Sequence, residues 1–340
     1  MTGREIIRRL INHDGPPRFG FDFNNGVTDF TGARIMKPVF RYDDKLSVFG
    51  RHPELLARLD NFGGEVRLNE FGDIYGRLRG ETGGECVLGC LEGDWGRLKD
   101  YRFPDYDPEY DDEILKKDFA NCDKFAVGYL PFAIFSRFRD SRRMENAFAD
   151  TLLEPDNVRA LLEMEQKILI AAVGKAAMLG FDAVMFSDDL GTQHALFISP
   201  KTFRELFKPV YAAVAGEARR LGLKFIMHSC GMIYEAIPDL IEAGINVFQF
   251  DQPELYGSDR LAREFGNKVC FYSPVDIQKI MPTGDRKLIE EGARFMTDNF
   301  KKYCRGGLIV NDYGSWKDLH VTEEWADWAR KAVIANADIN

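Results

Sequence analysis

The chain has 340 residues, enough for one large domain or two ordinary ones, and its hydrophobic content of 45% is sufficient for a substantial core. A formal net charge of −9 argues against nucleic acid or an anionic membrane as the main partner, because either would require a basic face. The first residues form no apolar signal core and no apolar run could cross a membrane, so we expect a cytoplasmic protein. Six cysteines are too few for a dense disulfide framework in a chain of this length, and we expect free thiols or metal ligands.

The predicted elements alternate between short apolar strands and helical stretches. A first strand is predicted at residues 18–24. Six more strands are predicted at residues 125–132, 183–189, 223–230, 246–251, 269–273 and 307–313. Helices are predicted between and after them at residues 157–179, 200–221, 233–243, 259–264, 285–303 and 322–335.

Regular β-α alternation predicts an α/β fold with a parallel sheet and helices outside, and this number of units favours a closed (β/α)8 TIM barrel. Seven strands are identified in this way and the eighth is left unassigned. Residues 26–121 are rich in Gly, Asp, Tyr and Arg, with short alternating runs. We expect them to form an N-terminal excursion over the barrel mouth, with a small hairpin sheet, inside a single domain that spans residues 1–340.

The segment Phe225-Ile-Met-His-Ser-Cys-Gly231 resembles a buried strand that ends in His228 and Cys230. Residues i and i+2 of a strand point to the same side, so both side chains would project together from its carboxyl end. Imidazole nitrogen and thiolate sulfur are zinc ligands, and catalytic zinc sites use three protein ligands. The structural alternative is a hydrogen-bonded histidine beside a small buried thiol.

Strand alternation predicts which other polar side chains share this rim of the barrel. Large apolar residues such as Phe186 and Phe248 suit the helix-facing side, which places the neighbouring polar residues inside. The inward-facing set at the carboxyl ends is then Asp22, Asp189, Asp251, Asn311 and Tyr313, together with His228 and Cys230. Active sites of this fold are built at that end, so the convergence favours a functional site.

Several motifs together resemble the uroporphyrinogen decarboxylase-like superfamily. They are Phe186-Ser-Asp-Asp-Leu-Gly-Thr-Gln193, His228-Ser-Cys-Gly231, Ile237-Pro-Asp-Leu-Ile-Glu-Ala-Gly244 and Gln252-Pro253. More narrowly, the chain is similar to the zinc-dependent, corrinoid-linked methyltransferases of that superfamily, which carry a His-x-Cys pair at this position. The true decarboxylases carry an arginine-rich N-terminal signature that residues 18–23 lack, so we discount porphyrinogen decarboxylation.

The third zinc ligand is the main departure from the family pattern. The thiol-methylating members have a cysteine in a turn after the last strands, whereas residues 310–315 read Val-Asn-Asp-Tyr-Gly-Ser. Cys304 precedes its strand and Cys270 lies near the start of its strand, so both should lie at the opposite end of the barrel. We therefore expect an oxygen ligand from Asp251, Asp189 or a carboxylate of the excursion, which makes the zinc a harder Lewis acid.

The resemblance implies transfer of a methyl group from a small methylated substrate to a Co(I) corrinoid protein. A harder zinc suits an ether oxygen and phenylalanines near the mouth would line a pocket for an aromatic ring, so a methoxylated aromatic is the leading candidate substrate. The chain contains no cobalamin-binding Asp-x-His-x-x-Gly motif, so the corrinoid would arrive on a partner. Asp189 and Asp251 are the expected catalytic carboxylates. The expected substrate contacts are Asp22, Gln193, Tyr272, Asn311 and Tyr313.

Other functions stay open at this point. One is the reverse reaction on a thiol of the coenzyme M type, which the missing cysteine weakens. A second is a decarboxylase in which Asp22 or Asp189 stabilises a cationic intermediate, and a third is a non-catalytic ligand-binding barrel. A homodimer is also open, since the sequence does not fix the oligomeric state.

Overall fold

The computed structural model spans residues 1–340 and describes all of them except 40–62, 79–83, 108, 121, 305–306 and 340. Eight parallel strands form a nearly closed barrel in the order β1-β11-β10-β9-β8-β7-β6-β2. Their bounds are β1 Gly20–Asp22, β2 Phe30–Arg34, β6 Phe125–Tyr129, β7 Ala183–Ser187, β8 Lys224–His228, β9 Val247–Gln249, β10 Cys270–Ser273 and β11 Leu308–Asn311. The (β/α)8 prediction is therefore confirmed.

The eighth strand, β2, lies inside the segment that was predicted to be excursion, so the excursion begins after Arg34 and not at residue 26. Sequence pattern missed it because Thr31, Gly32 and Arg34 interrupt its apolar character and no helix separates it from β1. The segment that leads into β2 is joined to β1 by an isolated bridge between Asp22 and Thr28 and by a 2.8 Å hydrogen bond from the Asp29 amide to the Phe21 carbonyl.

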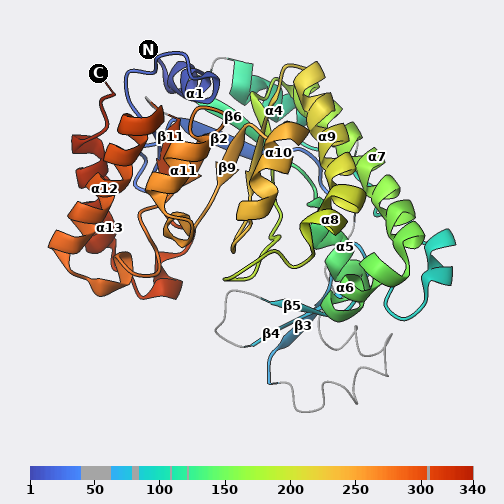
Figure 1. Ribbon diagram of the computed structural model, residues 1–340. Coiled ribbons are helices and arrows are strands. Elements are labelled where there is room, and N and C mark those ends of the chain that lie inside the picture. Colours follow the sequence, from blue (N-terminus) through green and yellow to red (C-terminus); the bar gives the residue numbers. More distant parts are fainter. Residues whose placement is uncertain (40–62, 79–83, 108, 121, 305–306, 340) are drawn as a thin grey trace.

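Helices surround the sheet, with α7, α9 and α10 on one side and α11, α12 and α13 on the other (Figure 1). The α-helices are α1 Gly3–Asn12, α4 Asp112–Ala120, α5 Ile134–Arg142, α6 Met144–Leu153, α7 Pro155–Leu179, α8 Pro200–Thr202, α9 Lys208–Arg220, α10 Ile237–Ala243, α11 Ser258–Phe265, α12 Arg286–Cys304 and α13 Glu323–Ala335. One π-helical turn, η2 Phe203–Phe207, joins α8 to α9. Short 3₁₀ helices are η1 Trp95–Lys99, η3 Tyr234–Ala236, η4 Pro253–Leu255, η5 Met281–Thr283 and η6 Trp316–Leu319. Among the described helices, none combines the length and the apolar character that crossing a membrane would require.

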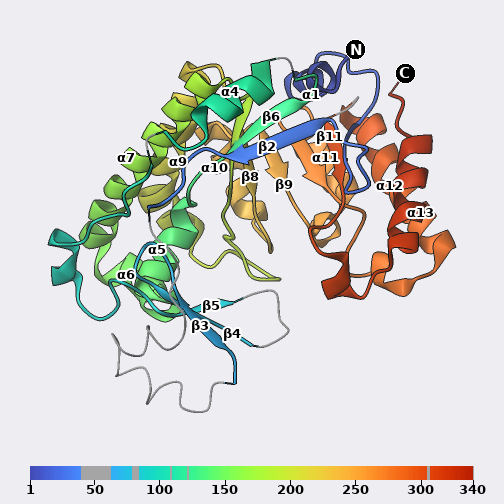
Figure 2. The ribbon, with the colours of Figure 1, turned by 180° about the vertical axis from the view of Figure 1, so that it is seen from behind.

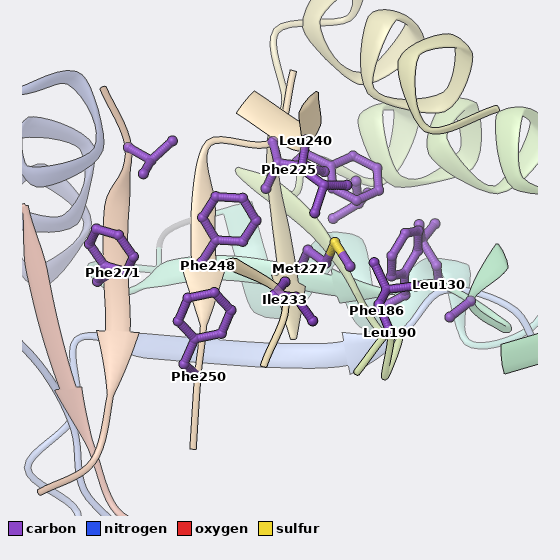
Figure 3. Packing of buried hydrophobic residues seen from close by; sticks show 14 of the residues in the cluster. Leu130, Phe186, Leu190, Phe225, Met227, Ile233, Leu240, Phe248, Phe250 and Phe271 are labelled. Carbon is purple, nitrogen blue, oxygen red and sulfur yellow. The ribbon is translucent and has the colours of Figure 1, made fainter. Parts of the chain in front are cut away.

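Aromatic side chains on the outer face of the strands fill the layer between barrel and helices. Phe186, Phe225, Phe248, Phe250 and Phe271 all point to this layer and are almost fully buried (Figure 3). The alternation that sends these residues outward sends their neighbours inward, which confirms the predicted parity of β7, β8 and β9.

The amino-terminal end of the barrel is closed by α1. Thr2 and Glu5 form a capping box at its start, and Ile6, Ile7, Leu10 and Ile11 are buried on one face. These side chains pack against inward-facing strand residues that belong to the same cluster, namely Phe125, Val127, Ala183, Ile226, Val247 and Ile309. The bottom of the barrel is thus mainly apolar, and apart from Lys224 at the start of β8 the polar interior positions of the strands lie at the carboxyl end.

The excursion contains the antiparallel sheet β3 Glu65–Leu68, β4 Ile74–Arg77 and β5 Glu85–Leu88, as the alternating runs predicted. Figure 2 shows this sheet beside α5 and α6, at the end of the molecule opposite α1. A buried ion pair of 2.5 Å joins Asp73 of the excursion to Arg137 of α5, and the Arg137 guanidinium lies 4.4 Å from the centre of the Phe71 ring. These contacts attach the excursion to the barrel.

Candidate metal centre

Three side chains converge at the carboxyl ends of β7 and β8. Ser187 pairs with His228 in the sheet, so the residues that follow each strand, Asp189 and Cys230, leave the barrel at the same level. Nε2 of His228 lies 3.4 Å from Sγ of Cys230 and 3.4 Å from Oδ1 of Asp189, and the three donor atoms all lie within 4.8 Å of one another. The site opens toward solvent on the carboxylate side, since the Asp189 side chain is 44% exposed and that of His228 only 13%.

The backbone around Cys230 is held by two glycines in close contact. Gly231 has φ +78°, and a Cβ built there would lie 2.1 Å from the carbonyl oxygen of Gly191 in the loop after β7. The Cys230 amide donates to Oδ1 of Asp189 at 2.7 Å, and the Tyr256 hydroxyl donates to the Gly231 carbonyl. The loops after β7 and β8 therefore fix the thiol and the carboxylate relative to each other.

The imidazole of His228 is oriented by a chain of hydrogen bonds from β9. Nε2 of Gln249 donates to Oδ1 of Asp251 at 2.8 Å, which turns Oε1 of Gln249 toward Nδ1 of His228. Nδ1 of His228 is then the protonated nitrogen, and Nε2 faces the thiol and carboxylate. Histidine ligands of metals are commonly fixed by a partner on the other ring nitrogen, and Gln249 supplies that partner here.

Charge within the cluster favours a bound cation. Burial alone would lower the pKa of His228, but hydrogen bonds with Asp189 and Cys230 and the charges of Cys230 and Asp251 raise it well above its ordinary value. Burial acts to raise the pKa of Asp189, yet the hydrogen bond and charge of His228 and the Cys230 amide hold it below its usual range. An imidazole, a thiolate and a carboxylate in this arrangement fit a borderline-soft divalent ion such as zinc, with a position left for substrate.

Two of the remaining predicted residues lie beside the cluster. Asp251 acts on His228 through Gln249, and it is Asp189 that joins the three-donor group. Burial and the charges of Asp251 and Cys230 raise the pKa of Tyr313, whose ring packs 6.0 Å from that of Trp316.

Asp22, Tyr272 and Asn311 form a second polar group on β1, β10 and β11. The Tyr272 hydroxyl donates to Asp22, and the Thr28 hydroxyl donates to the other oxygen of that carboxylate at 2.7 Å. Asn311 lies opposite Asp22 in the β1–β11 pairing, and its buried Oδ1 has no hydrogen-bond partner among the described residues.

Gln193 lies on the exposed loop after β7, where its Nε2 donates to Oε1 of Gln252 at 3.4 Å, and that oxygen also accepts from the Gly231 amide at 3.2 Å. Oε1 of Gln193 accepts a hydrogen bond of 3.1 Å from Gln278. Cys270 and Cys304 are both buried, and burial raises the pKa of each thiol. Cys270 packs in the cluster beneath α1, as expected for the opposite end of the barrel.

A cavity of about 440 Å³ lies next to the cluster, at the carboxyl ends of β2, β6 and β7. Ser187, the cross-strand partner of His228, is part of its wall. The wall also contains Arg34, Met36, Pro38, Glu70, Tyr106, Tyr129, Leu130, Pro131, Phe132, Ala133, Met185 and Phe186. Glu70 and Tyr106 belong to the excursion, so the described part of the excursion covers this side of the mouth.

The fold and the site define a (β/α)8-barrel protein with a candidate metal centre at the carboxyl end of its strands. The family model described as uroporphyrinogen decarboxylase (URO-D) matches residues 125–311, more than half of the chain, and the chain belongs to this family.

Two proteins from Methanosarcina mazei are similar to it. The methylated-thiol–coenzyme M methyltransferase is 25% identical over 141 residues, which cover 42% of this chain and 36% of that protein, so the match spans about a third of the relative's length. The solved structure of a methyltransferase superposes on 99% of this chain and 98% of its own, with a TM-score of 0.66 and 11% identity, and shares the fold.

Sequence reasoning found His228, Cys230 and Asp189, but it assigned no role to Gln249. Alternation along residues 246–251 places Gln249, like Asp251, on the inward-facing side, and this position is the signal that could have identified it. Arg34 was not predicted as a site residue because its strand, β2, was not predicted.

Proposed function

We propose that this protein is a zinc-dependent methyltransferase that transfers a methyl group from a small methylated substrate to a Co(I) corrinoid carried by a partner protein. The observation that carries the proposal is the cluster of Asp189, His228 and Cys230 at the catalytic end of the barrel. Similarity to two methyltransferases supports the same reaction class.

The donor set favours an oxygen-bound methyl group. His228, Cys230 and Asp189 would hold the zinc ion with one thiolate, which leaves the metal harder than a site with two. When bound, zinc supplies Lewis acidity that stabilises negative charge on the heteroatom that loses its methyl group. The leading substrate is therefore a methoxylated aromatic, whose ring would lie in the adjacent cavity beside Tyr129 and Phe132.

The protein groups around the cluster position and shield the reacting atoms. Gln249 and Asp251 hold the His228 ring, and Tyr272 is kept a neutral hydroxyl by burial and by Asp22, which raise its pKa well above its usual range. Asp22 itself accepts two hydrogen bonds within the protein. Asp22, Asn311 and Tyr313 lie outside the wall of the cavity, so we assign them substrate contacts elsewhere in the barrel mouth, and we assign Gln193 to the rim.

Methyl transfer involving a thiol is the second candidate, because one relative is a methylated-thiol–coenzyme M methyltransferase. The sequence departs from the thiol-methylating pattern in having no cysteine at residues 310–315. A single thiolate in the cluster favours the oxygen substrate over the thiol.

Metal analysis tests the proposal directly. Purified wild type, Cys230→Ser and a control variant, Cys122→Ser, are analysed for metals by mass spectrometry after growth with zinc. We expect about one zinc per chain in wild type and control, and its loss in Cys230→Ser. Methoxylated aromatics are then tested with a reduced corrinoid protein, following the Co(I) absorbance. Absence of metal from the zinc-supplemented wild type would contradict the mechanism and place a decarboxylase first.

A further inference from the structure

Arg34 is a cation at the mouth of the barrel that has no charged partner among the described residues. It ends β2, where strand alternation from Phe30, a member of the interior cluster, directs it inward. It pairs with Tyr129 of β6, which pairs in turn with Met185 of β7. Arg34, Tyr129 and Met185 all line the cavity of about 440 Å³.

The position of Arg34 distinguishes it from the other inward-facing cation of the barrel strands. Lys224 lies at the amino-terminal end of β8, where Nζ bonds Oδ1 of Asn12 at 2.5 Å. The carboxylates of the strands at the mouth already have partners: Asp22 accepts from Tyr272 and Thr28, and Asp251 accepts from Gln249. Among the described residues of the barrel strands, Arg34 is therefore the positive group that remains available to a ligand.

We propose that Arg34 binds the carboxylate of an aromatic substrate whose methyl-bearing oxygen lies at the cluster of Asp189, His228 and Cys230. In the sheet order β2 and β8 are separated by β6 and β7, so a ligand in the cavity runs from Arg34 past Tyr129 to Ser187, beside His228. Arginine recognises a planar carboxylate through two parallel N–H donors. The proposal rests on the proposed function and adds the substrate class.

The other polar groups of the cavity indicate a singly charged ligand. Glu70 contributes a carboxylate to the same wall. Burial raises the pKa of Tyr106, and the negative charge of Glu70 raises it further. This negative charge disfavours a doubly charged phosphate more strongly than a carboxylate. The buried Tyr106 hydroxyl has no hydrogen-bond partner in the described part of the chain, and it is a free donor for a ligand oxygen.

Calorimetric titration of the zinc-loaded protein with 4-methoxybenzoate and with the neutral 4-methoxybenzamide tests this assignment. We expect wild type to bind the acid roughly 10-fold or more tightly than the amide, because a charge-assisted pair is lost in the amide. Arg34→Met should remove the preference, and Arg34→Lys should restore part of it. Lys37→Met is the matched control, since Lys37 lies over the Tyr110 ring and does not line the cavity.

A second variant moves the preference in the opposite direction. Glu70→Gln removes the like charge and should strengthen binding of the acid while leaving the amide unchanged. Equal affinity for acid and amide, absence of binding by a folded wild type, or unchanged binding of the acid to Arg34→Met would each overturn the proposal. Binding of the acid without methyl transfer would support this inference and contradict the proposed function. Methyl transfer from a neutral ether with no preference for the acid would support the proposed function and contradict this inference.

Discussion

Nδ1 of His228 donates a hydrogen bond to Oε1 of Gln249, and this contact joins the last residue of β8 to the last residue of β9. His228 and Gln249 are paired in the sheet, so the backbone register itself brings the two side chains together. The amide of Gln249 is in turn fixed by Asp251 at 2.8 Å. The orientation of the candidate zinc ligand is thus set by strand pairing and not by a flexible loop.

Removing the amide should weaken metal binding without removing a ligand. We expect Gln249→Leu to bind zinc about 10–100-fold more weakly than wild type, because the imidazole loses the partner that fixes its tautomer and orientation. Competition with a chromophoric chelator measures the dissociation constant. Gln278→Leu is the control, since Gln278 is an exposed amide at the rim. Equal zinc affinity in Gln249→Leu and wild type would show that the contact has no role in metal binding.

The buried pair of Asp73 and Arg137 should be a major source of stability for the excursion. Asp73→Asn leaves the Arg137 charge buried without compensation, which costs about 3–5 kcal/mol. The control Arg77→Met breaks an exposed pair with Glu65 and should cost less than about 1 kcal/mol. Urea unfolding measures both values. A similar small cost for the two variants would mean that the excursion is held by other contacts.

The same pair predicts a pH dependence. Burial acts to raise the pKa of Asp73, but the charge and hydrogen bond of Arg137 outweigh it and hold the pKa below its ordinary value. A carboxylate with a lowered pKa in the fold contributes stability above its unfolded pKa of about 3.9, and this contribution is lost as the pH falls. The difference in stability between wild type and Asp73→Asn should therefore shrink in acid. A constant difference between pH 7 and pH 3 would contradict the assignment.

The sequence predicted the barrel interior well because alternation along a strand is a local property. Large phenylalanines on one face of residues 183–189 and 246–251 identified the helix-facing side, and Asp189 and Asp251 followed from parity. His228 and Cys230 could be predicted as neighbours from their spacing alone, because residues two apart at one strand end point to the same side. The structure then showed that Asp189, and not Asp251, shares the donor group with them.

The features that the sequence did not predict depend on contacts between distant segments. β2 follows β1 without a helix, and Thr31, Gly32 and Arg34 give it no apolar run. Helix α1 closes the barrel by packing against strand residues that are distant from it in the sequence, such as Ile309 of β11. The sequence around Asp73 predicts only a turn residue, and its ion pair with Arg137 of α5 is known only from the fold.

Glu165 should make the fold less stable as the pH rises. It is fully buried in α7, neither carboxyl oxygen has a hydrogen-bond partner among the described residues, and burial raises its pKa well above the usual value against the opposing charge of Arg137. A raised pKa means that the folded state keeps a proton that the unfolded chain releases above about pH 4.3, so stability falls as the pH increases.

Glu165→Gln should therefore raise Tm by a few degrees at pH 8 and have little effect at pH 4, where both states hold the proton. Glu163→Gln is the matched control, because Glu163 is exposed on the same helix. Calorimetry at the two pH values gives the comparison. A Tm difference for Glu165→Gln that does not depend on pH would show that Glu165 is ionised within the fold.

Gly231 and Gly222 offer a test of how the glycine contact supports the metal centre. Both have positive φ, +78° and +79°, but a Cβ at Gly222 meets nothing within 4 Å, whereas one at Gly231 lies 2.1 Å from the Gly191 carbonyl oxygen. Gly222→Ala should lower the free energy of unfolding only by the cost of a left-handed backbone conformation, about 1–2 kcal/mol, and the variant should keep its zinc. Gly231→Ala must displace the loop that carries Cys230, so we expect loss of bound zinc as well as stability. Full zinc content in Gly231→Ala, measured by mass spectrometry beside Gly222→Ala, would show that the loops after β7 and β8 can move apart without disturbing the cluster.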